Sequence, residues 1–227
     1  MSTIKIAKSA IDLMIMDEVG AEYPGDKRYY NKFLAHPTWP KGQSGVTVGI
    51  GYDLGYQSAS QIKKDWNGLV NGNYLTQMMS AAGFKGIDAK KQIGPLMRQV
   101  VIPYDIAMQV FINKSIPAAY EQALSVYPGL DKLNDKTIGA IVSLVYNRGA
   151  KLTGTNREEM AQLKPLIEKA NYKAIADTIE SMKHIWEGGT TNDDGLVTRR
   201  IQEANLIRQS LTTTAKNDSD YLSFEMV

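Results

Sequence analysis

Hydrophobic residues recur at steps of three and four along most of this chain, which is the period of an amphipathic helix. The first run occupies residues 4–18 and predicts a helix whose inner face consists of Ile4, Ala7, Ile11, Met14 and Glu18. The same spacing predicts further helices over residues 58–66, from Pro103 onward, over residues 137–147, after Asn171 and over residues 196–211. We therefore expect a mainly α fold.

The ends and inner faces of these helices are also marked in the sequence. Ser58 and Pro103 are typical of the start of a helix, and Gly149 is typical of a helix stop. The last two helices are expected to face the core through Ile175, Ile179, Met182 and Trp186, and through Val197, Ile201, Ala204 and Leu211. The segment from Thr212 is polar, so we expect one domain over residues 1–211 and a loosely ordered tail over residues 212–227.

Residues 45–55 (GVTVGIGYDLG) have a different pattern, in which apolar and polar or glycine positions alternate as in a strand. In one extended strand Thr47 and Asp53 would lie about 20 Å apart, at roughly 3.3 Å per residue. The two glycines between them permit a hairpin, which would place the two residues on facing strands about 5 Å apart. An ordinary hairpin with a surface threonine and aspartate fits the same pattern, so the function of this segment stays open at this point.

The composition is that of an ordinary globular protein, 43% hydrophobic and 22% charged over 227 residues. The net charge of +2, with scattered Lys and Arg residues, gives no indication of nucleic-acid binding. The absence of cysteine excludes disulfides and cysteine metal sites, and with two histidines no His-rich metal site is expected. No apolar stretch reaches the roughly 20 residues that span a bilayer. Lys8, Asp12 and Asp17 interrupt the apolar core that a signal peptide would need.

Glu18 is the most informative acidic residue, because it occupies the last inward position of the first helix, just before a glycine-containing turn. Burial raises the pKa of a carboxyl group, and a raised pKa suits a proton donor near neutral pH. A role in capping or decorating the helix end is the alternative. Asp12 and Asp17 fall off the apolar stripe and are expected to face solvent. Glu22 is the rival proton donor, but it also lies off the stripe.

Four segments, taken in order, resemble the phage-type lysozymes, the glycoside hydrolases of phage endolysins. That family has a helix ending in Asp-Glu-Gly, a hairpin with Thr-(Ile/Val)-Gly-Ile-Gly, a helix ending in an aromatic-Asn-x-Gly sequence, and a tryptophan followed by a Gly-rich loop and Gly-Leu-Val-x-Arg-Arg. The counterparts here are DEVG (17–20), TVGIG (47–51), IVSLVYNRG (141–149), Trp186 with Gly188-Gly189, and GLVTRR (195–200). The resemblance spans about residues 4–211.

One departure from that pattern points to a particular branch of the family. The usual phage lysozyme has a catalytic Asp shortly before the hairpin Thr, whereas residues 39–45 (WPKGQSG) hold no acid and Asp53 follows the glycines instead. This order is similar to that of the muramidase domain of pesticin and of lysozyme-like type VI secretion effectors. Residues 24–44 are longer than the usual connection, and we expect them to form part of the wall of the cleft.

The resemblance implies a lysozyme-like α+β fold, mainly α with a small β-hairpin lobe, in which two lobes flank a cleft. It implies hydrolysis of the β-1,4 bond between N-acetylmuramic acid and N-acetylglucosamine in bacterial peptidoglycan, with no metal and no cofactor. Glu18 would donate the proton, Asp53 would stay ionised in the wetter hairpin to orient a water or stabilise positive charge, and Thr47 would hold that water. A water between the two carboxyl groups would place them roughly 6.5–9.5 Å apart and invert the anomer.

Several other residues have two readings. Tyr52 and Tyr56 could stack on sugar rings or belong to the core, and Arg148 could bind peptide or N-acetyl groups of the substrate or pair with Glu18. Trp186 and the arginines at 199–200 are expected to be scaffold. Asp193 and Asp194 are interpreted as turn residues, because the alternating oxygen ligands of a calcium loop are missing.

Two rival functions share the same sequence features: a lytic transglycosylase, which would not need Asp53, and an inactive peptidoglycan-binding module. We expect a monomer whose partner is peptidoglycan, with no nucleic acid and no membrane span. Without a signal peptide, it would reach the periplasmic cell wall as an endolysin through a holin or as an antibacterial effector through a secretion system. A secreted effector would also have an immunity protein as partner.

Overall fold

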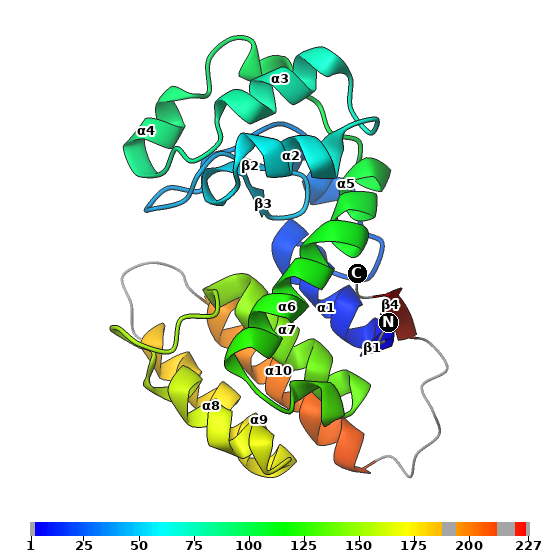
Figure 1. The fold of residues 1–227 in the computed structure, drawn as a ribbon, viewed down its shortest axis with the longest axis vertical. Coiled ribbons are helices and arrows are strands. Elements are labelled where there is room, and N and C mark those ends of the chain that lie inside the picture. Colours follow the sequence, from blue (N-terminus) through cyan, green and yellow to red (C-terminus); the bar gives the residue numbers. More distant parts are fainter. Residues whose placement is uncertain (1–2, 188–193, 213–220, 226–227) are drawn as a thin grey trace. The chain divides into compact units, whose positions relative to one another are not determined.

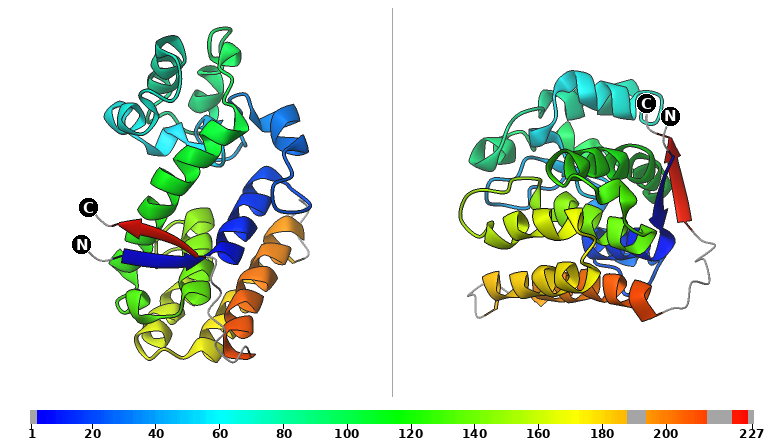
Figure 2. Two further views of the ribbon diagram at one scale, coloured as in Figure 1. Left: turned by 90° about the vertical axis from the view of Figure 1, so that its right-hand side faces the viewer. Right: turned by 60° about the horizontal axis from the view of Figure 1, so that its bottom comes forward.

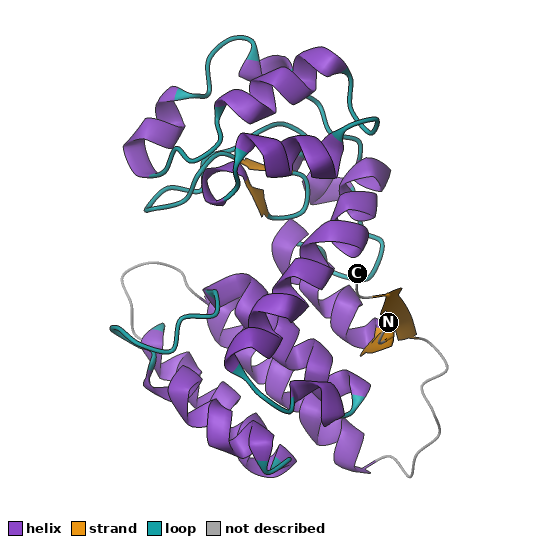
Figure 3. Cartoon of the chain, in the orientation of Figure 1, coloured by secondary structure: helices purple, strands orange, loops and turns teal. Residues whose placement is uncertain are grey.

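The computed structural model describes residues 3–187, 194–212 and 221–225 (Figure 1). These residues form ten α-helices and two small antiparallel sheets of two strands each, so helix dominates (Figure 3). The prediction of a mainly α protein with a small β component is confirmed. The chain divides into two compact units, unit 1 (Met1–Asp17 and Ile116–Val227) and unit 2 (Glu18–Ser115). In the part of the chain that the structure describes, no helix has the length and apolarity needed to cross a membrane.

Unit 1 is a helical bundle joined to one of the two sheets. Its elements are β1 (Thr3–Ala7), most of α1 (Lys8–Val19), α6 (Ile116–Val126), α7 (Asp135–Arg148), α8 (Glu158–Glu168), α9 (Tyr172–Ser181), α10 (Asp194–Thr212) and β4 (Tyr221–Glu225). Single 3-10 turns cover Leu130–Lys132 and Met182–Ile185. Helix α7 packs against α6 and α10, and α9 packs against α8 and α10.

Helix α7 is the centre of this bundle, because every residue from 137 to 145 is buried. The side chain of Asn134 caps its start by accepting a hydrogen bond from the backbone N–H of Thr137 at 2.9 Å. At its end, Gly149 adopts a left-handed φ of 73°, a conformation that favours glycine. The predicted stop at Gly149 is therefore confirmed.

The first predicted helix begins four residues too early. Residues 4–7 belong to β1, which pairs with β4 in antiparallel register, Ile4 opposite Phe224 and Ile6 opposite Leu222; the two strands lie side by side in Figure 2. Ile4 and Ile6 are buried while Lys5 is exposed, which is the period of a strand. The prediction of a loosely ordered tail is wrong for residues 221–225, since they form β4, and residues 213–220 lie outside the described residues.

The predicted inner face of the last helix is partly wrong. Leu211 is 51% exposed, and Val197 and Ile201 are only half-buried. The residues that α10 buries are Arg199, Arg200, Glu203, Ala204, Leu206 and Ile207. A hydrophobic pattern assigns charged residues to the outside, whereas here two arginines and a glutamate compensate one another inside the bundle. The predicted face of α9 is correct for Ile175, Ile179 and Met182, and Trp186 is half-buried.

Unit 2 consists of short helices around the second sheet. It holds β2 (Thr47–Val48), β3 (Tyr52–Asp53), α2 (Ala59–Trp66), α3 (Gly72–Ser80), α4 (Gly86–Lys91) and α5 (Tyr104–Val110). Turns of π type cover Tyr30–Leu34 and Phe111–Ser115, and 3-10 turns cover Leu54–Tyr56 and Met97–Gln99. Ser58 caps α2 through its hydroxyl, and α5 begins directly after Pro103, as predicted. Helices α3 and α4, and α6 and α8 in unit 1, were not predicted from the sequence.

Candidate functional site

The predicted hairpin is present, and it brings Thr47 and Asp53 together. In the β2–β3 pair, Thr47 lies opposite Asp53 and Val48 lies opposite Tyr52. The backbone N–H and C=O of Thr47 both form hydrogen bonds with the backbone of Thr38, on the side of β2 away from β3, at 2.8 and 2.9 Å. Thr47 and Asp53 therefore form a pair without hydrogen bonds between their backbones, the kind in which facing side chains lie closest. Their side chains share one face of this small sheet.

Backbone amides hold the carboxylate of Asp53 in place. One oxygen accepts the N–H of Gly45 at 2.9 Å, and the other accepts the N–H of Gly55 at 2.8 Å. The bond from Gly55 also caps the 3-10 turn Leu54–Tyr56. A Cβ added at Gly45 would overlap both the Asp53 carboxylate and the backbone of Gly55. Glycine at position 45 is therefore required by this close approach.

The surroundings of Asp53 are drier than the wet hairpin predicted from the sequence. Its side chain is half-buried, and this burial raises the pKa of Asp53 above its ordinary value of 3.8. The amides of Gly45 and Gly55 and the charge of Lys85 oppose the rise in pKa but do not cancel it. Asp53 thus accepts a proton more readily than a solvent-exposed aspartate.

Thr47 offers a hydroxyl beside this carboxylate. The residue is half-buried, and its backbone groups are used by Thr38. Within residues 3–187, 194–212 and 221–225, no hydrogen bond to the Thr47 hydroxyl is found. The hydroxyl is therefore available to hold a water or a substrate group on the face that it shares with Asp53.

Glu18 is the next-to-last residue of α1 and the first residue of unit 2. Glu18 is half-buried, as is Asp17 before it, whereas Val19 after it is buried. Glu18 is therefore less buried than the helical period predicts. Gly20 follows with a φ of 60° and ends the helix. Glu18 thus belongs to the same unit as Thr47 and Asp53, at the point where α1 enters it.

The expectation that Asp12 and Asp17 face solvent is wrong for Asp17 and holds only in part for Asp12. The side chain of Asp17 is 18% exposed, and its carboxylate lies 3.4 Å from Nε of Arg199. Asp12 is 25% exposed and pairs with Lys8 at 2.5 Å. The hydrophobic pattern could not anticipate Arg199, because this partner comes from a distant helix.

The rival acid Glu22 occupies a different environment. Its side chain is 78% exposed and forms an ion pair with Arg28 at 2.8 Å. The same guanidinium binds Asp26, and this pairing holds the pKa of Asp26 well below its usual range. Glu22 is therefore a solvated, ion-paired side chain and lacks the burial expected of the proton donor.

The two tyrosines of the hairpin region have different surroundings. Tyr52 is 6% exposed, donates its hydroxyl to Asp65 at 2.7 Å and packs edge-on against Trp66 at 5.4 Å between ring centroids. Since no face of its ring is open, we do not retain Tyr52 as a sugar-stacking residue. Tyr56 is 61% exposed, and Nζ of Lys85 lies 3.7 Å from its ring centroid.

A pair of aromatic residues near the end of α1 was missed by the sequence analysis. Tyr29 and Phe33 contact each other at 4.8 Å between ring centroids, and they are 48% and 47% exposed. The ring of Tyr29 lies against Gly20, 3.5 Å from the position of an added Cβ, and Gly20 is two residues beyond Glu18. Open aromatic faces of this kind suit the apolar faces of sugar rings. The only signal in the sequence was the four-residue spacing of Tyr29 and Phe33 within residues 24–44, the segment expected to form part of the wall of the cleft.

Arg148 lies in unit 1 as the last residue of α7. It donates a short hydrogen bond to the carbonyl of Asn156, its guanidinium lies 5.0 Å from the ring centroid of Trp186, and its own carbonyl accepts from Arg157 at 2.6 Å. Arg199 and Arg200 are 3% and 0% exposed, as expected of scaffold. Gly188-Gly189 and Asp193 lie outside the described residues. Across the described ranges, no group of three or more His, Cys, Asp or Glu side chains could hold a metal ion.

Part of this chain is similar to a known protein family. Residues 13–114 match a family described as a domain of unknown function (DUF8812). A search of curated proteins found no match to this chain. The matched residues run from the second half of α1 almost to the end of unit 2, so they include Glu18, Thr47 and Asp53 and exclude Arg148.

Proposed function

We propose that this protein is a muramidase, which hydrolyses the β-1,4 bond between N-acetylmuramic acid and N-acetylglucosamine in bacterial peptidoglycan. The observation that carries the proposal is the pairing of Thr47 with Asp53 on one face of the hairpin. This pairing puts a hydroxyl and a carboxylate side by side in the unit that Glu18 enters. Glu18 and Thr47 lie in two of the four segments that resemble phage-type lysozymes, and Asp53 has the position expected in the pesticin-like branch.

The proposed chemistry assigns one role to each of these residues. Glu18 donates its proton to the glycosidic oxygen, so the leaving sugar departs as an alcohol. The Thr47 hydroxyl positions a water that attacks the anomeric carbon, and this water gives up a proton as the new C–O bond forms. Asp53 stabilises the positive charge that develops on the sugar and accepts that proton, a role that its raised pKa favours.

Open aromatic faces in unit 2 support binding of a sugar polymer. Tyr29 and Phe33, next to the end of α1, and Tyr56, just after the hairpin, are each about half or more exposed. Aromatic rings contribute a large apolar contact area at little cost in side-chain entropy. We propose that they hold the glycan strand, and that residues 24–44 form part of the wall of its cleft.

A specific observation also favours a second candidate, a lytic transglycosylase. Both carboxylate oxygens of Asp53 are occupied by backbone amides, which is sufficient to explain the residue as a structural brace of the hairpin. A transglycosylase needs the acid but no second carboxylate, because an internal hydroxyl of the substrate attacks in place of water. The two activities give different products from the same bond.

Product analysis distinguishes these candidates. Purified sacculi are digested with the protein, and the soluble fragments are analysed by mass spectrometry. A muramidase leaves reducing N-acetylmuramic acid ends, whereas a transglycosylase leaves anhydro ends that are lighter by one water. Binding to sacculi without release of fragments would indicate an inactive binding module. The proposed biological setting is a phage endolysin released through a holin or an antibacterial effector with an immunity protein. Expression of the protein in the periplasm of a bacterium tests whether it lyses the cell from that compartment.

A further inference from the structure

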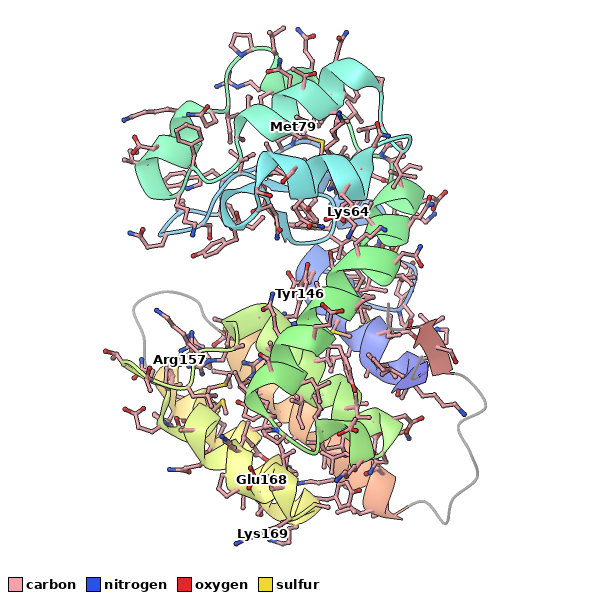
Figure 4. All side chains as sticks on the ribbon, viewed as in Figure 1. Lys64, Met79, Tyr146, Arg157, Glu168 and Lys169 are labelled. Carbon is pink, nitrogen blue, oxygen red and sulfur yellow. The ribbon has the colours of Figure 1, made fainter. Side chains whose placement is uncertain are left out.

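Four arginines gather in unit 1 around Trp186 and the first half of α10. The guanidinium carbons of Arg148 and Arg200 lie 5.0 and 5.8 Å from the ring centroid of Trp186. Arg157 joins them by donating to the carbonyl of Arg148 at 2.6 Å, and Figure 4 places it in the segment that leads into α8. Arg199 is the neighbour of Arg200 in the helix. Such a concentration of like charge in a half-buried region requires compensation.

The acidic residues nearby compensate only part of this charge. Arg199 is paired with Asp17 and with Glu203, each at 3.4 Å. Arg200 donates to Glu203 at 2.8 Å through Nη2 alone. For Arg148 and Arg157, no ion pair exists within the described ranges. The third acid, Glu159, is bound by His184 at 2.6 Å.

Several guanidinium nitrogens are buried without a partner. Among the residues that the structure describes, Nη1 of Arg148, Nη1 of Arg157, and Nε and Nη1 of Arg200 have no hydrogen-bond acceptor. The side chain of Arg200 is 0% exposed, so bulk water does not accept hydrogen bonds from its guanidinium group. Buried donors are almost always paired, and a charged donor is the most costly one to leave unpaired.

Burial and the neighbouring arginine charges both act on Arg148. Burial, followed by the charges of Arg157 and Arg200, lowers the pKa of Arg148 to about 10. The opposing contributions of Glu159 and Glu203 are smaller. An anion bound beside these guanidinium groups would offset the repulsion between their charges and supply acceptors for unpaired N–H groups.

We propose that Arg148, Arg157 and Arg200 form a binding site for an oxyanion beside the ring of Trp186. Guanidinium groups are planar and present several N–H donors at once, which matches the oxygen atoms of a carboxylate or a phosphate. A free phosphate ion and the carboxylate of a peptide share this chemistry. All residues of this proposed site belong to unit 1, and the proposal does not depend on the proposed muramidase activity.

Calorimetric titration of the full-length protein tests the proposal with two probes, inorganic phosphate and N-acetyl-D-alanine, at constant ionic strength set with chloride. We expect saturable binding of at least one probe by the wild type. Arg157→Gln should weaken it roughly tenfold or more, because a charge-assisted donor is lost. The matched control is Arg98→Gln, which removes the same charge from an exposed position in unit 2 and should bind as the wild type does. Binding of phosphate alone identifies a phosphate site, and binding of N-acetyl-D-alanine alone identifies a carboxylate site.

The proposal is overturned if the folded wild type binds neither probe, or if Arg157→Gln binds as tightly as the wild type. Circular dichroism establishes that the variant is folded. If Arg157→Gln does not fold, the wild type is tested instead, by nuclear magnetic resonance of its arginine Nε–H groups. Addition of the bound probe should then shift the Nε–H signal of the buried Arg200, and an unshifted signal would overturn the proposal.

Discussion

Replacement of Asp53 by asparagine perturbs the best-defined contacts of the candidate site. The carboxylate of Asp53 accepts backbone N–H groups from Gly45 at 2.9 Å and from Gly55 at 2.8 Å, one on each oxygen. Asparagine has a single oxygen, so one of these donors would face an NH2 group instead. Leaving a buried donor unsatisfied costs about 1–3 kcal/mol. We expect Asp53→Asn to lower the free energy of unfolding by about that amount at neutral pH.

The same substitution should change how stability depends on pH. Burial raises the pKa of Asp53 above 3.8 in the folded state, so the folded protein binds this proton more readily than the unfolded chain does. Between the ordinary and the raised pKa, the contribution of Asp53 to the free energy of unfolding therefore falls as the pH rises. Asparagine does not titrate. The stability difference between wild type and Asp53→Asn should thus shrink as the pH rises through a window that begins near pH 3.8.

Urea unfolding followed by tryptophan fluorescence measures both effects, since Trp39 and Trp66 lie in unit 2. The matched control is Asp88→Asn in the same unit. Asp88 is 59% exposed and pairs with Lys91 at 2.6 Å, and loss of such a surface pair changes stability by about 0.5 kcal/mol or less. If Asp53→Asn is as stable as this control at neutral pH, the two amides do not hold the carboxylate and the reasoning about Asp53 is refuted.

Three further substitutions test other parts of the site. Thr47→Ala should lose most release of soluble fragments from sacculi while its circular dichroism and melting temperature stay unchanged, and wild-type release would remove Thr47 from the mechanism. Gly45→Ala should be destabilised by about 1–3 kcal/mol in urea, because its Cβ would overlap Asp53 and Gly55, whereas Gly72→Ala, with open space around it, should not be. Tyr52→Phe should lose about 1–2 kcal/mol of stability with its buried hydrogen bond to Asp65 but keep its KM for sacculi; a raised KM would instead indicate contact with substrate.

The sequence predicted best where the cause is local. Ser58, Pro103 and Asn171 mark helix starts through their own side chains or ring, and each precedes a helix in the structure. The hairpin at residues 45–55 was predictable in the same way, because alternation and two glycines determine it within a few residues. Local chemistry was therefore sufficient for the starts of α2, α5 and α9 and for the pairing of Thr47 with Asp53.

Predictions failed where the deciding partner is distant in the chain. Residues 4–7 have an apolar spacing that fits a helix or a strand, and only pairing with β4 at the other end of the chain makes them β1. Arg199, Arg200 and Glu203 are charged, yet they lie in the interior, where Glu203 pairs with both arginines and Asp17 pairs with Arg199. No hydrophobic pattern contains that information.

The candidate site shows the same division. The sequence identified Thr47 and Asp53 by type and spacing, but the amides of Gly45 and Gly55 that hold the carboxylate became visible only in the folded chain. The burial of Tyr52 against Trp66 likewise depends on how the hairpin lies on α2. Roles that depend on exposure therefore need the fold, whereas candidates for the chemistry could be named without it.

Release of soluble fragments from purified sacculi by wild type, Glu18→Gln and Glu22→Gln, at equal concentrations of folded protein, tests whether the protein is a muramidase with Glu18 as its proton donor. We expect reducing N-acetylmuramic acid ends from the wild type and a loss on the order of 10²–10⁴-fold in Glu18→Gln, because an amide cannot donate the proton. Glu22→Gln, which alters only an exposed ion pair, should release fragments within a few-fold of the wild type. Wild-type release by Glu18→Gln, or no release by the folded wild type, would contradict the account.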